Sequence, residues 1–322
     1  MRAARISEHG GPEALEVVEA AEVQPGEGEV LITVHAAGVN FIDTYQRSGA
    51  YPLELPATLG LEGAGEIAAV GPGVTHRNIG DRVAWSDAMG SYAEQVVVRG
   101  QRTVPVPADL DLDRAAALML QGMTAHYLSY STKHLNADDT VLVYAPAGGV
   151  GQLLVQLATW RGARVLAATS TDAKAERARQ LGADEVIRYR DVDVPQAVAE
   201  LTDGEGVDVV YDSVGASTFD ASLRCLRPRG LMVLYGQSSG PVPPVDPQLL
   251  NRAGSLFLTR PSLAHYVAEP DELHWRATTV LDLAAHGQLD VAIHDRYPLE
   301  DAGRAHRDLE SGRTAGKLLL LP

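Results

Sequence analysis

The segment Val141-Leu-Val-Tyr-Ala-Pro-Ala-Gly148-Gly149-Val150-Gly151 decides the fold of this chain. It runs from an apolar, strand-like stretch through three glycines into a helix-length segment, Gln152–Arg161. A dinucleotide pyrophosphate needs this arrangement, because helix amides point at the anion and glycines let the backbone come close. The segment therefore predicts the first strand, turn and helix of a dinucleotide-binding domain.

Four more apolar runs follow this segment, and a helix-length stretch such as Asp172–Leu181 separates the first of them from the next. Alternation of buried strands and helices, with little polar face on the strands, is typical of a doubly wound parallel sheet. We therefore expect an α/β domain with a Rossmann sheet. The four further strands are predicted at Val165–Ala168, Val186–Tyr189, Val207–Tyr211 and Leu231–Tyr235.

The first third of the chain has a different residue pattern, in which short valine-rich stretches lie between glycines and prolines. Its period of two residues predicts an antiparallel, partly open β-barrel. Asp111 or Asp113 is expected to cap the helix that follows. The residue pattern leaves open whether the tail, which contains a predicted helix at Asp271–His286, is a third unit or part of the first domain. The predicted barrel strands are Glu29–Val39, Glu62–Val70, Asp81–Trp85 and Ser91–Val98.

The end of the second strand of the doubly wound sheet discriminates between the two nicotinamide cofactors. An NAD site carries Asp or Glu there, about 20 residues after the glycines, to bind the ribose hydroxyls. Here the strand leads into Thr169-Ser170-Thr171, and Lys174 follows. Hydroxyls and a cation suit the 2′-phosphate of NADPH. We interpret Asp172 as the N-cap of the next helix rather than as a ribose ligand.

Composition narrows the function classes. The 322 residues include 27 Lys and Arg and 42 Asp and Glu, so the formal net charge is −15. Such a surface repels phosphate backbones and anionic membranes, which argues against nucleic acid as the main ligand. No apolar run has the length of a signal peptide or a membrane span, so we expect a cytoplasmic protein. Cys225 is the one cysteine, which excludes an intrachain disulfide and a four-cysteine zinc site.

Eight segments in chain order identify a family. The sequence resembles the zinc-independent quinone oxidoreductases of the medium-chain dehydrogenase/reductase superfamily, particularly the bacterial NADPH:quinone reductases. The segments are Ala37-Gly-Val-Asn-Phe-Ile-Asp-Thr-Tyr45, Gly60-Leu-Glu-Gly-Ala-Gly65, Gly80-Asp-Arg-Val83, Gln121-Gly-Met-Thr-Ala-His126, Ala147-Gly-Gly-Val-Gly151, Tyr211-Asp-Ser-Val-Gly215, Thr259-Arg-Pro-Ser262 and Gly316-Lys-Leu-Leu.

The resemblance implies a GroES-like catalytic barrel built from both chain ends, with the nucleotide-binding domain inserted between them. The expected domains are residues 1–122 and 265–322 for the barrel and 123–264 for the Rossmann domain. It also implies an active site in the cleft and a homodimer joined through the nucleotide-binding domains. Pro146 departs from the family, which usually has a small residue there, and a proline lacks one backbone donor.

The resemblance also assigns site residues. It places Asn40, Tyr45 and Tyr51 on the substrate and nicotinamide side as candidate catalytic residues, and Thr124 against the carboxamide. The remaining cofactor candidates are Gly148, Gly149, Val150 and Gly151 for the pyrophosphate, Ser170, Lys174 and Tyr189 for the 2′-phosphate and adenine, and Ser238, Ser239 and Lys317.

No metal site is expected. Zinc-dependent relatives have a cysteine in place of Asn40 and a His–Glu pair in place of Leu61-Glu62, and neither an amide nor a leucine is a competent zinc ligand. Without a metal, the substrate must already be electrophilic, as quinones and conjugated enones are. We therefore predict an NADPH-dependent quinone reductase. Two alternatives remain: an NADPH-dependent enone or alkenal reductase, and a crystallin-like or nucleic-acid-binding relative without a main enzymatic role.

Overall fold

The computed structural model describes all residues from 1 to 322, and they form two compact units. Unit 1 contains Met1–Met123 and Tyr266–Pro322, and unit 2 contains Thr124–His265. The boundaries expected after residues 122 and 264 each lie one residue before these limits. The tail that the residue pattern left unassigned is part of unit 1.

Unit 2 contains a six-stranded sheet in the order β11-β10-β9-β12-β13-β14. Every neighbouring pair of strands in it is parallel, which confirms the predicted doubly wound sheet. Its elements are η3 (a π-helical turn, Leu128–Thr132), β9 (Thr140–Tyr144), α3 (Gly149–Trp160), β10 (Arg164–Thr169), α4 (Asp172–Gln180), β11 (Glu185–Arg188), α5 (Val194–Leu201), β12 (Val207–Asp212), α6 (Phe219–Cys225), β13 (Leu226–Leu234), α7 (Pro247–Arg252) and β14 (Phe257–Thr259), followed at the unit boundary by α8 (Leu263–Tyr266).

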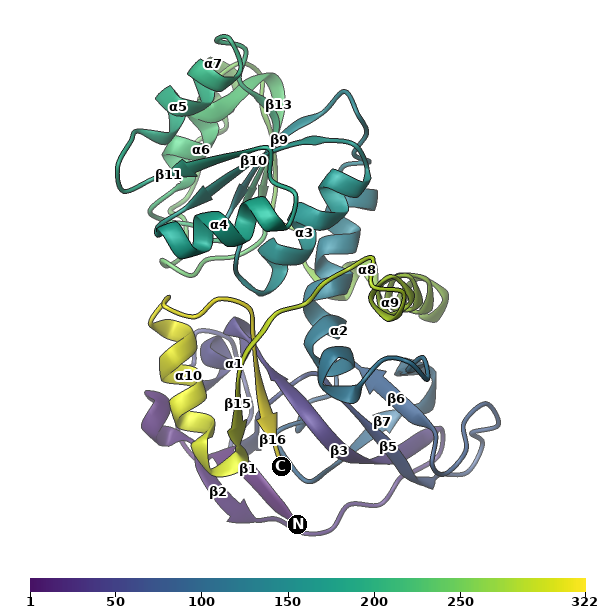
Figure 1. Ribbon diagram of the computed structural model, residues 1–322. Helices are drawn as coiled ribbons and strands as arrows, with labels where there is room; N and C mark the ends of the chain where they lie inside the picture. The colour runs from purple at the N-terminus through teal and green to yellow at the C-terminus, as the bar shows by residue number, and fades with distance from the viewer. The chain divides into compact units, whose positions relative to one another are not determined.

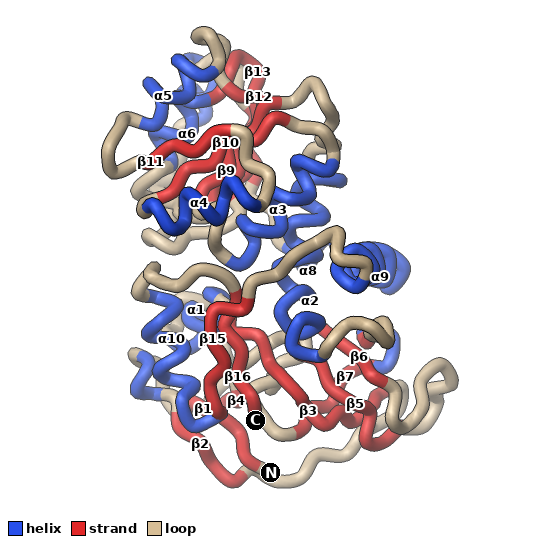
Figure 2. The backbone as a smooth tube through the Cα atoms, viewed as in Figure 1, coloured by secondary structure: helices blue, strands red, loops and turns tan.

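Helices cover both faces of this sheet (Figures 1 and 2). Leu142 of β9 and Leu166 of β10 share one buried cluster with Val198 of α5 and Leu223 of α6. Neighbouring side chains along a strand point to opposite faces, and α3 and α4 contact β9, β10 and β11. Burial on both faces explains the continuous apolar runs of these strands.

The sixth strand, β14, was not predicted from the sequence. It has three residues, and Phe257 at its start is 61% exposed. It pairs only with β13, so it forms one edge of the sheet. A short edge strand has no continuous apolar run, and a search for buried strands therefore passes over it.

Unit 1 contains a seven-stranded sheet, in which the path β15-β16-β3-β5-β6-β8 is joined by β7 on β3, and a three-stranded sheet β2-β1-β4. Most pairs are antiparallel as predicted, but β15 and β16 are parallel. The elements are β1 (Arg2–Ile6), η1 (Pro12–Ala14), β2 (Glu16–Glu19), β3 (Glu29–Val39), α1 (Phe41–Arg47), β4 (Ala57–Thr58), β5 (Gly63–Val70), β6 (Arg82–Trp85), β7 (Gln95–Arg99), η2 (Gly100–Arg102), β8 (Thr103–Pro105), α2 (Leu112–Tyr127, ending in unit 2), α9 (Pro270–Ala285), β15 (Ile293–Pro298), η4 (Leu299–Asp301), α10 (Ala302–Glu310) and β16 (Lys317–Leu321).

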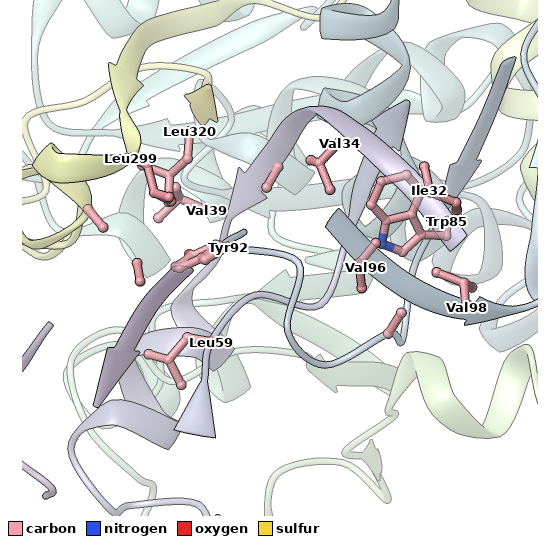
Figure 3. Close-up of a cluster of buried hydrophobic side chains, with 14 of the residues drawn as sticks. Ile32, Val34, Val39, Leu59, Trp85, Tyr92, Val96, Val98, Leu299 and Leu320 are labelled. Atoms are coloured by element: carbon pink, nitrogen blue, oxygen red, sulfur yellow. The ribbon is translucent and has the colours of Figure 1, made fainter. Parts of the chain in front are cut away.

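The core of unit 1 lies against these strands (Figure 3). Trp85 is fully buried beside Ile32 and Val98, and its indole N–H donates to the hydroxyl of Ser91 at 2.9 Å. The tail contributes to the same core through Leu320 of β16. The C-terminal segment is therefore an integral part of the barrel.

The return of β16 places the chain's last strand beside β3. The two strands are antiparallel, and Leu318 is opposite Val39. This register brings Lys317, at the start of β16, next to Asn40, at the end of β3. Residues 277 positions apart in sequence thus meet at one point of the barrel.

Two helix caps were expected in the sequence, and one of them was wrong. Asp111 caps α2, because its carboxylate accepts from the backbone N–H of Arg114 at 2.8 Å. Helix α4 is capped by Thr171, whose side chain accepts from the N–H of Lys174, and Asp172 is the first helical residue. Thr171 has the extended backbone of a cap residue, so the carboxylate of Asp172 is left for another partner.

Candidate cofactor and substrate sites

In the glycine turn between β9 and α3, the first turn of the helix packs closely against the backbone of Ala145. Ala145 has a φ of 51°, and its carbonyl accepts from the N–H of Gly148 at 2.9 Å. A Cβ on Gly151 would overlap that same carbonyl oxygen, so only glycine allows α3 to begin this close to the strand. The first amides of α3, from Gly149 onward, have no partner within the helix and suit a pyrophosphate.

Pro146 is compatible with this cradle. It is buried within the turn and precedes Gly148, the N-cap residue of α3. The donor that a proline lacks is therefore not one of the first-turn amides of α3. The observed turn fits the phosphates of a dinucleotide.

The candidate 2′-phosphate residues come from two neighbouring strands. Thr169 of β10 is opposite Arg188 of β11, and the N–H of Tyr189 donates to the carbonyl of Thr169 at 3.1 Å. This register places Tyr189, which is 44% exposed, beside the turn that contains Ser170. Lys174 follows in the first turn of α4, where burial and the charge of Arg190 lower its pKa.

The remaining cofactor candidates of unit 2 lie in different surroundings. Thr124 is buried in α2, and Ser238 is exposed in the loop after β13. The hydroxyl of Ser239 donates to the carbonyl of Val214 at 2.7 Å and accepts from the N–H of Ser217 at 3.0 Å. Their roles toward a cofactor stay predictions.

Asp212 at the end of β12 orders the neighbouring loop, and the sequence reasoning did not single it out. Its side chain is fully buried and accepts from the amides of Val214 and Gly215. It also accepts from the hydroxyls of Thr218 and Ser222, at 2.7 and 2.8 Å. The sequence signal for this residue is its position, because an aspartate directly follows a predicted buried strand.

In unit 1, Tyr45 and Tyr51 form an aromatic pair. Their ring centroids are 5.3 Å apart with a tilt of 51°, and the N–H of Tyr51 donates to the carbonyl of Tyr45 at 3.0 Å. Phe41 lies one helical turn before Tyr45, with its ring 6.3 Å away. Both tyrosines are half-buried, so this group presents aromatic surface to a ligand. The structure thus brings together two of the three candidate catalytic residues.

Asn40, the third candidate, is 3% exposed, and neighbours engage its whole amide. The amide nitrogen donates to the carbonyl of Gly38 and to the carboxylate of Glu62. The amide oxygen accepts from Gln121 and from the ammonium of Lys317. An asparagine amide has two donor hydrogens and two acceptor lone pairs, so this set is complete. Asn40 is the residue directly before α1, the helix that contains Tyr45.

Lys317 lies at the centre of this cluster. Its ammonium donates to the carboxylate of Glu62, to the side-chain oxygens of Asn40 and Gln121, and to the carbonyl of Val39. Burial lowers the pKa of Lys317, and the charge of Glu62 opposes that shift. All four acceptors belong to unit 1, and a contact of this ammonium with a cofactor stays a prediction. In the sequence, Glu62 was compared only with the zinc-binding pair of other relatives, and its pairing with Lys317 was not predicted.

A second buried chain of polar groups begins at Asp43, three residues after Asn40. The hydroxyl of Tyr92 donates to Asp43 at 2.7 Å and lies 3.2 Å from Nε2 of His306. Arg47 donates to Nδ1 of the same imidazole at 3.0 Å, so Nε2 carries the hydrogen that points at Tyr92. Burial raises the pKa of Asp43 to about 7 and, with the charge of Arg47, lowers that of His306 to about 3.

Comparison with known proteins gives the family. The profile of the alcohol dehydrogenase GroES-like domain matches residues 26–108, and that of the zinc-binding dehydrogenases matches residues 149–268. A quinone oxidoreductase of Pseudomonas aeruginosa is 43% identical over 99% of this chain and 98% of its own length. The chain belongs to the quinone oxidoreductase family. This confirms the resemblance found in the sequence.

Two further relatives describe the range of this family. The crystal structure of an Escherichia coli quinone oxidoreductase complexed with NADPH covers 100% of both chains, with 42% identity and a TM-score of 0.98. A 2-haloacrylate reductase of a Burkholderia species is 41% identical over 99% of this chain and 98% of its own length. The quinone oxidoreductase fold therefore also occurs in a reductase named for a halogenated alkene acid.

The name of the second matched profile raises the question of zinc. A zinc site needs three or four donors such as cysteine, histidine or carboxylate. The structure contains no group of three or more such residues placed to hold a metal ion, and Glu62 already binds the ammonium of Lys317. These residues do not fit a zinc ion.

None of the helices combines the length and the apolar character that a membrane span requires.

Proposed function

We propose that this chain is an NADPH:quinone reductase that works without a bound metal. The observation that carries the proposal is the turn in which Gly151 lies against the carbonyl of Ala145, followed by a second strand that leads into Ser170 and not into a carboxylate. The full-length similarity to an NADPH-complexed quinone oxidoreductase supports it.

Unit 2 contains the residues for the cofactor. The amides at the start of α3, with Gly148, Gly149, Val150 and Gly151, bind the pyrophosphate, and Ser170, Lys174 and Tyr189 contact the 2′-phosphate and adenine. Thr124 binds the carboxamide. When bound, NADPH supplies the electron pair, as a hydride, that reduces the substrate.

Unit 1 contains the residues for the substrate. The half-buried rings of Tyr45 and Tyr51 hold a flat quinone, and a phenol hydroxyl donates to the oxygen on which negative charge develops. A reduced quinone delocalises that charge, so one donor is sufficient and no Lewis acid is needed. Asn40 and Lys317 contribute by fixing the start of α1, not by touching the substrate.

Reduction of an activated alkene is the second candidate. The observation that favours it is the 2-haloacrylate reductase, which is nearly as similar to this chain as the quinone oxidoreductases. Both reactions place hydride on a carbon or oxygen conjugated to a carbonyl group, so the same donor residues serve either one. The substrates differ in shape and in charge, since a 2-haloacrylate carries a carboxylate and a quinone is neutral.

The test is a side-by-side assay of NADPH oxidation with a quinone, a cyclic enone and 2-chloroacrylate. We expect the highest kcat/KM for the quinone. A Gly151→Val variant should lose NADPH binding, and Gly26→Ala, where a Cβ would meet only the flexible end of the Glu29 side chain, controls for loss of a glycine elsewhere. A higher kcat/KM for either alkene would move the assignment to the second candidate, and no oxidation with any substrate would overturn both.

We also propose a homodimer that forms through unit 2. The strand β14 ends the sheet with an unpaired edge, and Phe257 on it is 61% exposed. An open edge with an exposed aromatic side chain suits pairing with a second copy. Light scattering should give twice the chain mass of 34.3 kDa, and Phe257→Lys should shift it to the monomer. A cytoplasmic location stays a prediction from the sequence.

A further inference from the structure

Arg188, the last residue of β11, is paired with a carboxylate at the candidate 2′-phosphate site. One guanidinium nitrogen contacts the carboxylate of Asp172, and another contacts Asp191. The backbone of Arg188 in β11 is opposite Thr169, the last residue of β10. The arginine side chain therefore extends from β11 to Asp172, the first residue of the helix α4 that follows β10. The Asp172 side chain is 88% exposed and that of Arg188 is 36% exposed.

Asp172 is the residue that does not suit NADPH. It follows Ser170 by two positions and precedes Lys174 by two, so its carboxylate belongs to the same turn as the phosphate ligands. A free carboxylate near the end of the second strand repels a 2′-phosphate and accepts from the ribose hydroxyls of NADH instead. Because Thr171 caps α4, the helix does not require the carboxylate of Asp172.

Two further cations, Lys174 and Arg190, lie beside this ion pair. Arg190 is exposed and makes no ion pair or hydrogen bond, and its charge acts on Lys174. Lys174 itself is partly desolvated, and both effects lower its pKa. An anionic ligand placed between two neighbouring cations stabilises the charged form of both.

We propose that Arg188 is a specificity-determining positioning residue: it neutralises Asp172, so that the 2′-phosphate of NADPH meets Lys174 and Arg190 and no free carboxylate. The inference rests on the proposed NADPH site and adds the reason why a chain with an aspartate in this turn prefers NADPH. Loss of Arg188 exposes the carboxylate, which opposes the phosphate and favours the unphosphorylated ribose.

The test uses fragments of the two cofactors, so that binding is measured without catalysis. Binding of 2′,5′-ADP and of 5′-AMP is measured by calorimetry for the wild type, Arg188→Met, Asp172→Asn and the double variant. The preference for 2′,5′-ADP should fall about two- to fivefold in Arg188→Met, in the range of one surface charge pair. The double variant should regain most of it, and Asp172→Asn alone should bind 2′,5′-ADP at least as tightly as the wild type.

Two comparators separate the proposal from other roles of the arginine. Lys174→Ala removes a proposed direct contact, and adding Asp172→Asn to it should leave most of its loss in place. Arg179→Met removes a similar ion pair on α4, with Glu176, and should leave the preference unchanged. Retained 5′-AMP binding in each variant shows that the unit is folded.

The outcomes distinguish the inference from the function on which it rests. If the wild type does not prefer 2′,5′-ADP over 5′-AMP, the proposed NADPH site is wrong. If it does, but the double variant is as weak as Arg188→Met, then Arg188 binds the phosphate directly and the inference is overturned. An unchanged preference in Arg188→Met overturns it as well.

Discussion

The ammonium of Lys317 donates to the carboxylate of Glu62 where neither side chain reaches solvent, with exposures of 2% and 0%. The backbone N–H of Leu120 in α2 occupies the other carboxylate oxygen at 2.6 Å. One ion pair therefore ties the last strand, the start of β5 and helix α2 together. Burial of two charged groups costs desolvation free energy, and their mutual attraction offsets that cost only while both groups are present.

Replacing Lys317 with methionine should destabilise the protein by about 3–5 kcal/mol, because the carboxylate of Glu62 is then buried without its counterion. The oxygens of Asn40 and Gln121 also lose their shared donor. The measurement is the midpoint of denaturant unfolding, followed by fluorescence.

The matched control for Lys317→Met is the double variant with Glu62→Gln. Glu62→Gln removes the carboxylate charge that Lys317→Met leaves without a counterion, so the double variant should recover a large part of the lost stability. The two substitutions should couple strongly in a double-mutant cycle. Additive effects would contradict the idea that one residue serves as the other's counterion.

Stability should respond to pH through two buried groups with opposite signs. The pKa of Asp43 is raised to about 7 in the folded protein, so its contribution is present at low pH and is lost as pH rises from about 4 toward 7. The pKa of His306 is lowered to about 3, so its contribution is present at high pH and is lost as pH falls below about 6.5. Between about pH 4 and 6.5 the two slopes oppose each other, each at roughly 1 kcal/mol per pH unit.

Single variants should separate these slopes. In Asp43→Asn, stability relative to wild type should increase with pH between about 4.5 and 6.5, and in His306→Gln it should decrease over the same range. Melting temperatures across a pH series measure both. If the melting temperatures of both variants follow that of the wild type in parallel across the pH series, these two groups titrate in the folded protein as they do in the unfolded chain.

The doubly wound sheet could be predicted because its strands are buried on both faces, and continuous apolar runs are a strong signal. The edge strand at Phe257 could not, since one exposed face and three residues leave no such run. The cap of α4 shows another limit. Thr171 and Asp172 are both good cap residues, and only the backbone decides which of them precedes the helix.

The candidate site also contains parts that the sequence predicts and parts that it does not. The glycine turn is local in sequence, and a motif describes it. The pairing of Lys317 with Glu62 depends on the register of β16 against β3, and nothing near either residue indicates a partner 255 positions away. Asn40 was recognised by its position, but its role changes once its neighbours are known, because its amide has no free donor.

Activity should not depend on a metal ion. The structure holds Asn40 in amide hydrogen bonds and Glu62 on an ammonium, so two positions that supply ligands in zinc-dependent relatives are engaged. Prolonged treatment with a strong chelator should leave kcat/KM with a quinone unchanged, and metal analysis should find less than one zinc per chain. A zinc-dependent alcohol dehydrogenase treated in parallel shows that the chelator works. Zinc at one per chain that tracks activity would end this interpretation.

Tyr45 and Tyr51 should contribute to the reaction through different parts of the same side chain. Tyr→Phe at either position removes a donor and keeps the ring, so it should cost about 1–2 kcal/mol in kcat/KM with quinones. Tyr→Ala should cost more, because it also removes the facing aromatic surface of the pair, whose rings are 5.3 Å apart. NADPH affinity should change little, and Ile42→Val, on the same helix but outside the aromatic group, controls for packing of α1. If all four tyrosine variants match the wild type with quinones, the aromatic pair is structural and the substrate binds to other residues of unit 1.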